Sequence, residues 1–210
     1  PMPSLKDLKN RIKSVKSTQK ITKAMKMVAA SKLRRAREQA AAARPYSQAM
    51  ERMLESLASS MAEGSGPKLM VGTGSSSTQL IIVATADRGL CGAFNSSIVR
   101  AVRRRVRDLE SQGVTVKLLC IGRKGYEQLR QEFAKNIVSH TELMKGRTLT
   151  YSEAESAAQE VMQRFEAGEF DICHIVYNQF KSVISQVVTF QQLIPFQLPE
   201  KGVAPATHEP

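Results

Sequence analysis

The segment Asp87–Gly92 is the part of this sequence whose residue types could act on a phosphate-bearing cofactor. It reads Asp-Arg-Gly-Leu-Cys-Gly and lies between a predicted buried strand and a predicted helix. In a doubly wound sheet this turn is where backbone N–H groups cradle phosphate. Arg123 and Lys124 follow the next predicted strand, at a place where basic side chains could bind a 2′-phosphate. The glycine spacing is G-x-x-G without a Walker lysine, so tight-turn glycines are the simpler interpretation and an NADP-binding α/β enzyme is an alternative.

Thiols and imidazoles are scattered along the chain rather than clustered. The three cysteines and three histidines contain no CxxC pair and show no metal-ligand spacing. They are Cys91, Cys120, Cys173, His140, His174 and His208. No Ser-His-Asp or Cys-His constellation is evident either. We therefore expect no catalytic residue, no metal and no cofactor, and we interpret the cysteines as reduced and intracellular.

A stripe of lysines near the N-terminus is the strongest candidate for binding. Its spacings of 3 and 4 place its members on one side of a helix. The members are Lys6, Lys9, Lys13, Lys16, Lys20 and Lys23. Neighbouring like charges at these spacings destabilise an isolated helix by about 0.2–0.5 kcal/mol per pair. Acidic residues at i±4 are almost absent, which favours an acidic partner over a merely solvated face.

Nucleic acid is one polyanion that such lysines could bind through its phosphates. Residues 1–45 contain no Phe, Tyr or Trp that could stack on bases, and no recognisable nucleic-acid-binding module. We therefore expect no nucleic-acid partner. The alternative hypothesis is a basic helix-bearing nucleic-acid-binding protein.

A long basic helix, the shaft, must carry these lysines, and we expect it over residues 1–62. Residues 1–63 contain no glycine, and Ser4 is a plausible cap. Apolar residues form a narrow seam of the coiled-coil type. The seam comprises Leu5, Leu8, Ile12, Val15, Ile21, Leu54 and Leu57. A helix of this extent is roughly 85 Å long, so it should project from any single domain, and Pro45 predicts a kink or brief break near residues 41–44.

The pattern changes after a Gly- and Ser-rich stretch at residues 63–79, which we interpret as a flexible linker. Residues 80–195 then alternate between strand and helix patterns, which predicts a Rossmann-like, three-layer α/β domain with a mainly parallel sheet. The expected strands are 80–86, 114–121, 137–139, 172–177 and 183–194, and the expected helices are 96–112, 124–132 and 152–167. The last helix is expected to start at a capping box over Ser152–Glu155, and the last two strands to pair antiparallel.

Composition narrows the class of protein. The 210 residues are 42% hydrophobic, which permits a real core and argues against a disordered chain. The longest aliphatic run, residues 80–84, is far shorter than a membrane-spanning helix requires. Residues 1–44 contain 13 Lys or Arg against only two acids, whereas the remainder is nearly balanced. The net charge of +12 therefore belongs almost entirely to the helix.

Two segments resemble the gamma subunit of rotary F-type ATP synthases. Gln19–Leu33 reads QKITKAMKMVAASKL and is similar to the N-terminal signature of that family, and Asp87–Gly92 is similar to its first βα loop. Both matches are long and occur in the right order and separation. The resemblance implies a central-stalk rotor subunit, a shaft that turns inside a ring of alternating alpha and beta subunits, with the α/β body near the membrane rotor ring.

The resemblance also implies the partners and contact residues. The chain would carry no catalytic residue and would couple rotation to conformational cycling of the catalytic beta subunits. Its expected partners are the alpha and beta subunits, the epsilon subunit and the rotor ring of c subunits. Contacts with the catalytic ring are expected at Lys20, Lys23, Met25, Lys26, Val28 and Lys32. The expected location is peripheral, on the cytoplasmic side of a bacterial inner membrane, with the mitochondrial matrix side as second choice.

One departure from the family concerns the end of the chain. Members continue past the α/β body into a second long helix that pairs antiparallel with the first. Residues 196–210 of this sequence instead form a Pro-rich tail. We therefore expect the partner helix of the seam to be missing from this chain, either because the chain is a fragment or because that helix is supplied separately.

Overall fold

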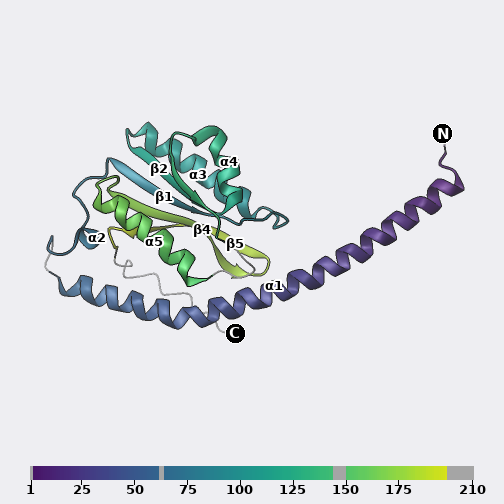
Figure 1. The fold of residues 1–210 in the computed structure, drawn as a ribbon, viewed down its shortest axis with the longest axis horizontal. Coiled ribbons are helices and arrows are strands. Elements are labelled where there is room, and N and C mark those ends of the chain that lie inside the picture. The colour runs from purple at the N-terminus through teal and green to yellow at the C-terminus, as the bar shows by residue number, and fades with distance from the viewer. Residues whose placement is uncertain (1, 62–63, 144–149, 198–210) are drawn as a thin grey trace. The chain divides into compact units, whose positions relative to one another are not determined.

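The chain divides into two units, Pro1–Ser60 and Met61–Pro210. The computed structural model describes residues 2–61, 64–143 and 150–197. The first unit contains helix α1 (Leu5–Ser60), and the second is an α/β domain (Figure 1). The expected tail at 196–210 lies outside the described residues from position 198 onward.

Helix α1 begins after Ser4, the cap predicted from the sequence, and the structure shows a reciprocal capping box with Asp7. The Ser4 hydroxyl accepts a hydrogen bond from the Asp7 N–H at 3.2 Å. In return, the Asp7 carboxylate accepts from the Ser4 N–H at 3.1 Å and from its hydroxyl at 2.6 Å. These bonds satisfy donors that a helix N-terminus would otherwise leave unpaired, and the hydrogen bonds from Ser4 lower the pKa of Asp7.

The helix runs through Pro45 without interruption, so of the predicted kink or brief break near residues 41–44, the break is wrong. Figure 1 shows α1 as a curved but unbroken ribbon. A proline removes one backbone hydrogen bond and crowds the preceding turn, and a helix of 56 residues that keeps its other bonds accommodates the ring by bending.

The α/β domain is built on a five-stranded sheet in the order β3-β2-β1-β4-β5. The strands are β1 (Thr78–Ala84), β2 (Thr115–Ile121), β3 (Ile137–Thr141), β4 (Ile172–Ser182) and β5 (Ser185–Ile194). All neighbouring pairs are parallel except β4 and β5, which form an antiparallel hairpin. This confirms the predicted mainly parallel, Rossmann-like sheet with an antiparallel pair at one end.

Helices cover both faces of the sheet (Figure 1). Helices α3 (Phe94–Ser111) and α4 (Arg123–Phe133) pack on one face. Helix α5 (Tyr151–Glu166) packs on the other, together with the short helix α2 (Lys68–Val71). The three-layer arrangement follows from the strands, which are buried on both sides and therefore need a helix layer on each.

Strand β1 shows how alternate residues supply two separate cores. Ile81 and Val83 contribute to the core beneath α3 and α4. Leu80 and Ile82 contribute to the core beneath α5, where Phe165 and Phe170 also pack. The five consecutive apolar or amide side chains from Gln79 to Val83 are all buried, because a central strand has no solvent-facing side.

The start of α5 differs from the predicted one. Thr150, rather than Ser152, is the N-cap, and its backbone N–H donates to the Glu153 carboxylate at 2.6 Å. The Thr150 hydroxyl donates to the same carboxylate at 2.8 Å. Thr150 and Ser152 are each followed by Glu three residues later, so the sequence alone could not separate the two registers.

The segment expected to be a flexible linker is largely docked on the domain. Helix α2 lies inside it, and β1 begins at Thr78 within its last residues. The Asp171 carboxylate accepts hydrogen bonds from the Thr73 hydroxyl at 2.7 Å, the Ser77 hydroxyl at 3.1 Å and the Thr78 N–H at 3.1 Å. The glycines and serines of this stretch therefore serve turns that bind one carboxylate, rather than a free linker.

We expect Asp171→Asn to lower the free energy of unfolding by about 1.5–3 kcal/mol, because an amide nitrogen cannot accept the bonds that the second carboxylate oxygen receives. The hydrogen bond from Thr73, followed by those from Thr78, Ser77 and Ser75, holds the pKa of Asp171 below its ordinary value. Its stabilising contribution is therefore complete above that ordinary pKa and disappears as the pH falls through the lowered one.

Urea unfolding of both proteins at neutral and acid pH measures this effect, and the difference between them should shrink on acidification. Asp108→Asn is the matched control, because Asp108 is exposed and its carboxylate forms no hydrogen bond or ion pair within the described residues. An equal loss in the two variants would contradict the role given to Asp171.

Candidate functional site: the exposed surface of α1

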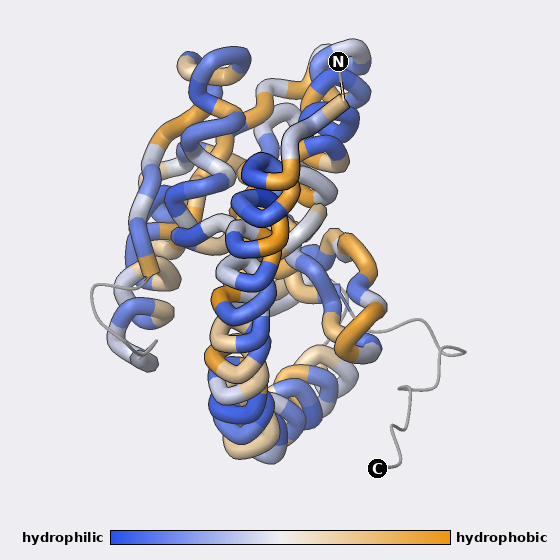
Figure 2. Tube along the Cα trace, turned by 90° about the vertical axis from the view of Figure 1, so that its right-hand side faces the viewer, coloured by the Kyte–Doolittle hydropathy of each residue, from blue (hydrophilic) through white to orange (hydrophobic). Residues whose placement is uncertain are grey.

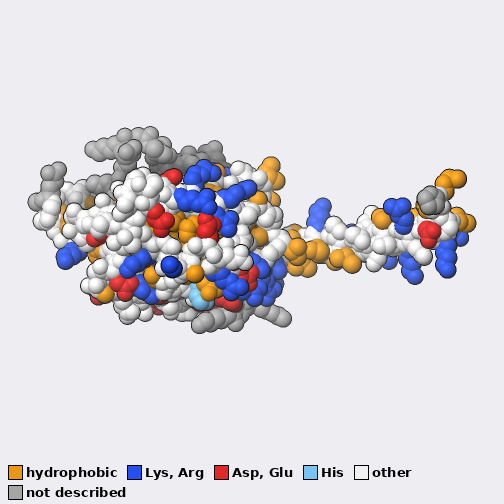
Figure 3. All heavy atoms as spheres, turned by 90° about the horizontal axis from the view of Figure 1, so that it is seen from above, with side chains coloured by type: hydrophobic (Ala, Val, Ile, Leu, Met, Phe, Trp, Pro, Cys, Tyr) orange, Lys and Arg blue, Asp and Glu red, His pale blue; other side chains and the backbone are white. Residues whose placement is uncertain are grey.

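Every lysine predicted to bind a partner lies on the surface of α1. No residue of the helix is buried, and all members of the lysine stripe are exposed. Blue and orange side chains occupy the surface of this helix in Figure 3. Basic and apolar side chains are thus exposed together on the surface of α1.

Within α1, all of whose residues the structure describes, one ion pair is found. It joins Arg34 to Glu38 at 3.7 Å, with both side chains more than half exposed. Such an exposed pair contributes little, typically 0–1 kcal/mol. No lysine of the stripe forms an ion pair with an acid of α1, so no such pair relieves the mutual repulsion predicted from the sequence.

The apolar seam predicted from the sequence is also exposed, except at Leu54, which is half-buried. Leu5 and Val15 are 70% and 67% exposed, and Ile21 and Leu57 are more than half exposed. Hydrophobic and hydrophilic stretches alternate turn by turn along α1 in Figure 2. Isolated exposed leucines are ordinary, but a periodic apolar row on a long helix is typical of a surface that another polypeptide covers.

The continuity of α1 separates the predicted seam into two stripes. Leu5, Leu8 and Val15 share one side of the helix, because Leu8 follows Leu5 by three residues and Val15 follows Leu8 by seven, which is two turns. Ile21 follows Leu8 by thirteen residues, which places it roughly 140° around the axis. Ile21 therefore starts a second stripe on another side of the helix and does not resume the first.

The predicted contact residues likewise divide into two rows. Lys20, Lys23 and Lys26 follow at spacings of three and form a basic row. The other row lies on a different side and mixes apolar and basic groups; it comprises Met25, Val28 and Lys32. Met25 and Val28 are each about half exposed, at 49% and 54%. The helix thus presents the predicted contact residues in more than one direction within the same few turns.

The Asp87–Gly92 loop is not arranged as a phosphate cradle. The Asp87 carboxylate accepts a hydrogen bond from the backbone N–H of Arg123 at 2.9 Å, so it occupies the N-terminus of α4. Lys124 lies 2.9 Å and the Arg123 guanidinium 3.6 Å from the Glu127 carboxylate. The hydrogen bond from Lys124 lowers the pKa of Glu127. The charges that a cofactor phosphate would need are thus already matched within the domain.

The neighbouring end of β1 is filled by the protein itself. The buried Thr85 hydroxyl accepts from the Gly125 N–H at 2.8 Å and lies 3.3 Å from the Gly122 carbonyl oxygen, to which it donates. A Cβ added at Gly125 would lie 2.6 Å from that hydroxyl oxygen, and one at Gly122 would overlap the Thr85 carbonyl. These glycines serve close packing of α4 against β1, and the sequence did not reveal Thr85 as their common partner.

The cysteines and histidines of the described residues form no cluster of three, although Cys120 and His140 are paired across β2 and β3. Cys120 and Cys173 are buried, and burial raises the pKa of each thiol to about 12. Cys91 is exposed, and its sulfur accepts a hydrogen bond from the Asn95 amide at 3.3 Å. His174 is half-buried in β4, where desolvation and then Arg105 lower its pKa. In the ranges that the structure describes, no three such groups come together as metal ligands, and no helix is long and apolar enough to cross a membrane.

Fold and surface together define a class: a subunit that acts by offering a long helix to other polypeptides, with an α/β domain attached. Comparison with known proteins gives the family. A family model described as ATP synthase matches residues 4–210. The chain belongs to the ATP synthase gamma chain family, whose members are non-catalytic subunits of that complex.

Individual relatives support this assignment. The ATP synthase gamma chain of Rhizobium etli is 55% identical over 208 residues, covering 99% of this chain and 71% of that protein. The gamma chain of Rhodospirillum rubrum is 57% identical over 199 residues, covering 94% of this chain and 67% of that protein. Among solved structures, the central stalk and c-ring of the Tetrahymena thermophila mitochondrial ATP synthase contains a chain with 32% identity and a TM-score of 0.63, covering 83% of this chain and 72% of that one. The function is that of a central-stalk rotor subunit, and neither the nucleic-acid nor the NADP alternative is supported.

Proposed function

We propose that α1 performs the rotor function through contacts of its two rows with the catalytic ring. The basic row, Lys20, Lys23 and Lys26, would face acidic surfaces of the beta subunits. The mixed row of Met25, Val28 and Lys32 would face another neighbour at the same time. The alpha and beta subunits, the epsilon subunit and the c ring are the partners that this role requires.

The observation that carries the proposal is the unrelieved lysine stripe on a fully exposed helix. Like charges at helical spacing destabilise the isolated helix, and no lysine of the stripe forms an ion pair with an acid of α1. An acidic partner would turn this repulsion into attraction. Charge attraction also acts at longer range and with less directional demand than apolar packing, so it suits a shaft that meets equivalent neighbours in turn.

The mechanism is a population shift. An asymmetric shaft presents a different row to each surrounding subunit, and each row stabilises one conformation of the subunit that it touches. Met25 is unbranched and adaptable, which fits a surface whose neighbours change. Rotation then changes the open and closed populations of each catalytic site. The size of the change is set by the difference between the affinities of a row for the open and for the closed state.

For the location, we propose peripheral attachment to the cytoplasmic side of a bacterial inner membrane through the complex. The bacterial sources of the relatives at 51–57% identity support this choice over a mitochondrial matrix location.

Co-purification tests the proposed partners. A tagged form of the chain, coexpressed with alpha, beta and epsilon subunits from the same source, should retain all three through affinity and size-exclusion steps. Raising the salt concentration should weaken retention of alpha and beta, because the exposed lysine contacts are screened. A folded chain that elutes alone at low salt would contradict the proposal.

A further inference from the structure

Helix α3 concentrates arginine to a degree that the rotor function does not explain. Its 18 residues include five arginines and no lysine, whereas the stripe on α1 is made of lysines. The five are Arg100, Arg103, Arg104, Arg105 and Arg107. Arginine presents a planar fork of donors that matches phosphate and carboxylate oxygens in pairs, which the ammonium of lysine does not.

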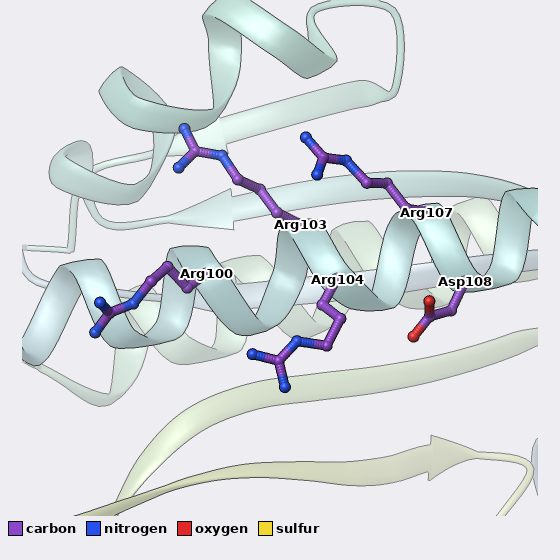
Figure 4. Close-up of a pocket in the computed structure, with 5 residues that line it drawn as sticks. All are labelled: Arg100, Arg103, Arg104, Arg107 and Asp108. Atoms are coloured by element: carbon purple, nitrogen blue, oxygen red, sulfur yellow. The ribbon is translucent and has the colours of Figure 1, made fainter.

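Four of these arginines line the exposed back of α3. The helix buries its opposite side, which includes Val99, Val102 and Val106. A hollow of about 310 Å³ is lined by Arg100, Arg103, Arg104, Arg107 and Asp108. Figure 4 shows Arg103 and Arg107 projecting from one side of the helix, and Arg104 and Asp108 from the other. The hollow therefore lies between two rows of side chains along the helix.

One side of the hollow is held in place by α4. The Arg103 Nε donates to the Glu132 carboxylate at 2.9 Å, and its Nη2 donates to the Gln128 carbonyl oxygen at 3.1 Å. Arg107 donates to the other oxygen of the same carboxylate, and this bond lowers the pKa of Glu132. Two guanidinium groups thus converge on one carboxylate, which leaves an excess positive charge and further N–H donors at fixed positions.

The other side of the hollow has charge without a partner. Within the part of the chain that the structure describes, Arg100 and Arg104 make no side-chain hydrogen bond or ion pair, and both are exposed. Asp108 stands one turn after Arg104, at the C-terminal end of the row. Four arginines therefore face two acids, one of which is already shared by Arg103 and Arg107. The N-terminal part of the hollow is the most positive.

We propose that the hollow on α3 is a binding site for a soluble oligophosphate, an anion with two or more linked phosphate groups. The span from Arg100 to Arg107 is roughly 10 Å along the axis, which is long for one phosphate and suits a short chain of them. Terminal oxygens would bind the unpartnered Arg100 and Arg104, and the fixed Arg103 and Arg107 would donate from the opposite side. Figure 3, which views the domain from the side of α3 and α4, shows Lys and Arg side chains gathered on this face.

Titration of the full chain with tripolyphosphate at physiological salt, followed by NMR of the arginine Nε–Hε groups, tests the site. The resonances of Arg100, Arg103, Arg104 and Arg107 should move together and saturate at one equivalent. The double variant Arg100→Gln/Arg104→Gln should weaken binding at least tenfold. Because both side chains are exposed, its unfolding midpoint should match that of the parent.

Two further variants make the result specific. Lys13→Gln/Lys16→Gln on α1 removes the same charge and should leave affinity within twofold, whereas Arg100→Lys/Arg104→Lys keeps the charge and should still weaken binding several-fold. Equal losses in the α1 and α3 glutamine variants, or unchanged affinity with lysine, would overturn the proposal, because binding would then reflect net charge alone. Arginine-dependent binding to phosphatidylglycerol vesicles without tripolyphosphate binding would also overturn it, in favour of a lipid headgroup.

Discussion

Replacing Lys23 and Lys26 together by glutamate should lower ATP synthesis at least about tenfold in membranes that contain the assembled complex, while ATP hydrolysis changes less. Both side chains are exposed on α1 and lie one turn apart in the basic row. Reversal converts two attractive contacts with an acidic neighbour into repulsive ones, and juxtaposed like charges cost several kcal/mol at an interface. Coupling should therefore fail before assembly does.

The ratio of proton-driven synthesis to uncoupled hydrolysis is the measurement. Lys6→Glu/Lys9→Glu is the matched control, because it makes the same charge change on the same helix, at positions three residues apart that lie outside the predicted contact residues. The α/β domain is a separate unit, so its unfolding should be unaffected by either variant. A synthesis-to-hydrolysis ratio that is the same in both double variants would count against Lys23 and Lys26 as the coupling residues.

Gly122→Ala should lower the free energy of unfolding of the α/β domain by roughly 3–5 kcal/mol, since it combines backbone strain with overpacking. Gly122 has a φ of +97°, a conformation that L side chains rarely adopt. Its new Cβ would overlap the carbonyl group of Thr85, which is backbone and cannot rotate away. The clash would separate β1 from the start of α4.

Chemical unfolding monitored by circular dichroism measures this loss, and Gly113→Ala separates its two causes. Gly113 also has positive φ, at +79°, but a Cβ there meets nothing within 4 Å. It should therefore show only the strain, about 1–2 kcal/mol. Equal losses at both positions would mean that the contact with Thr85 contributes nothing.

The elements of the α/β domain follow closely from sequence pattern. The predicted helix at 96–112 corresponds to α3, and the predicted strand at 114–121 corresponds to β2, each displaced by one or two residues. The hairpin was less well predicted, because β4 extends to Ser182 where we expected a connection. The outer part of β4 is exposed, so it lacks the apolar run that marks a buried strand.

The sequence predicted the features of the candidate site that depend on the geometry of a single helix, and only those. Spacing along α1 was enough to identify the lysine stripe, because neighbours on a helix surface are fixed by residue number. The division of the seam at Ile21 required knowing that residues 5–21 form one continuous helix. Arg123 and Lys124 looked available for a phosphate; Glu127 lies within helical spacing of both, but the hydrogen bond from the Arg123 N–H to Asp87 emerged only from the fold.

The sequence by itself determined the family, the alternation of strands and helices, and the basic polarity of the N-terminal helix, because these depend on residue type and short-range periodicity. Tertiary structure decided which polar groups meet across elements: Asp171 with the turn before β1, Thr85 with the glycines of α4, and Glu132 with two arginines of α3. Such pairs are separated by 25 or more residues along the chain, and only the packing of helix on sheet brings their atoms within hydrogen-bonding distance.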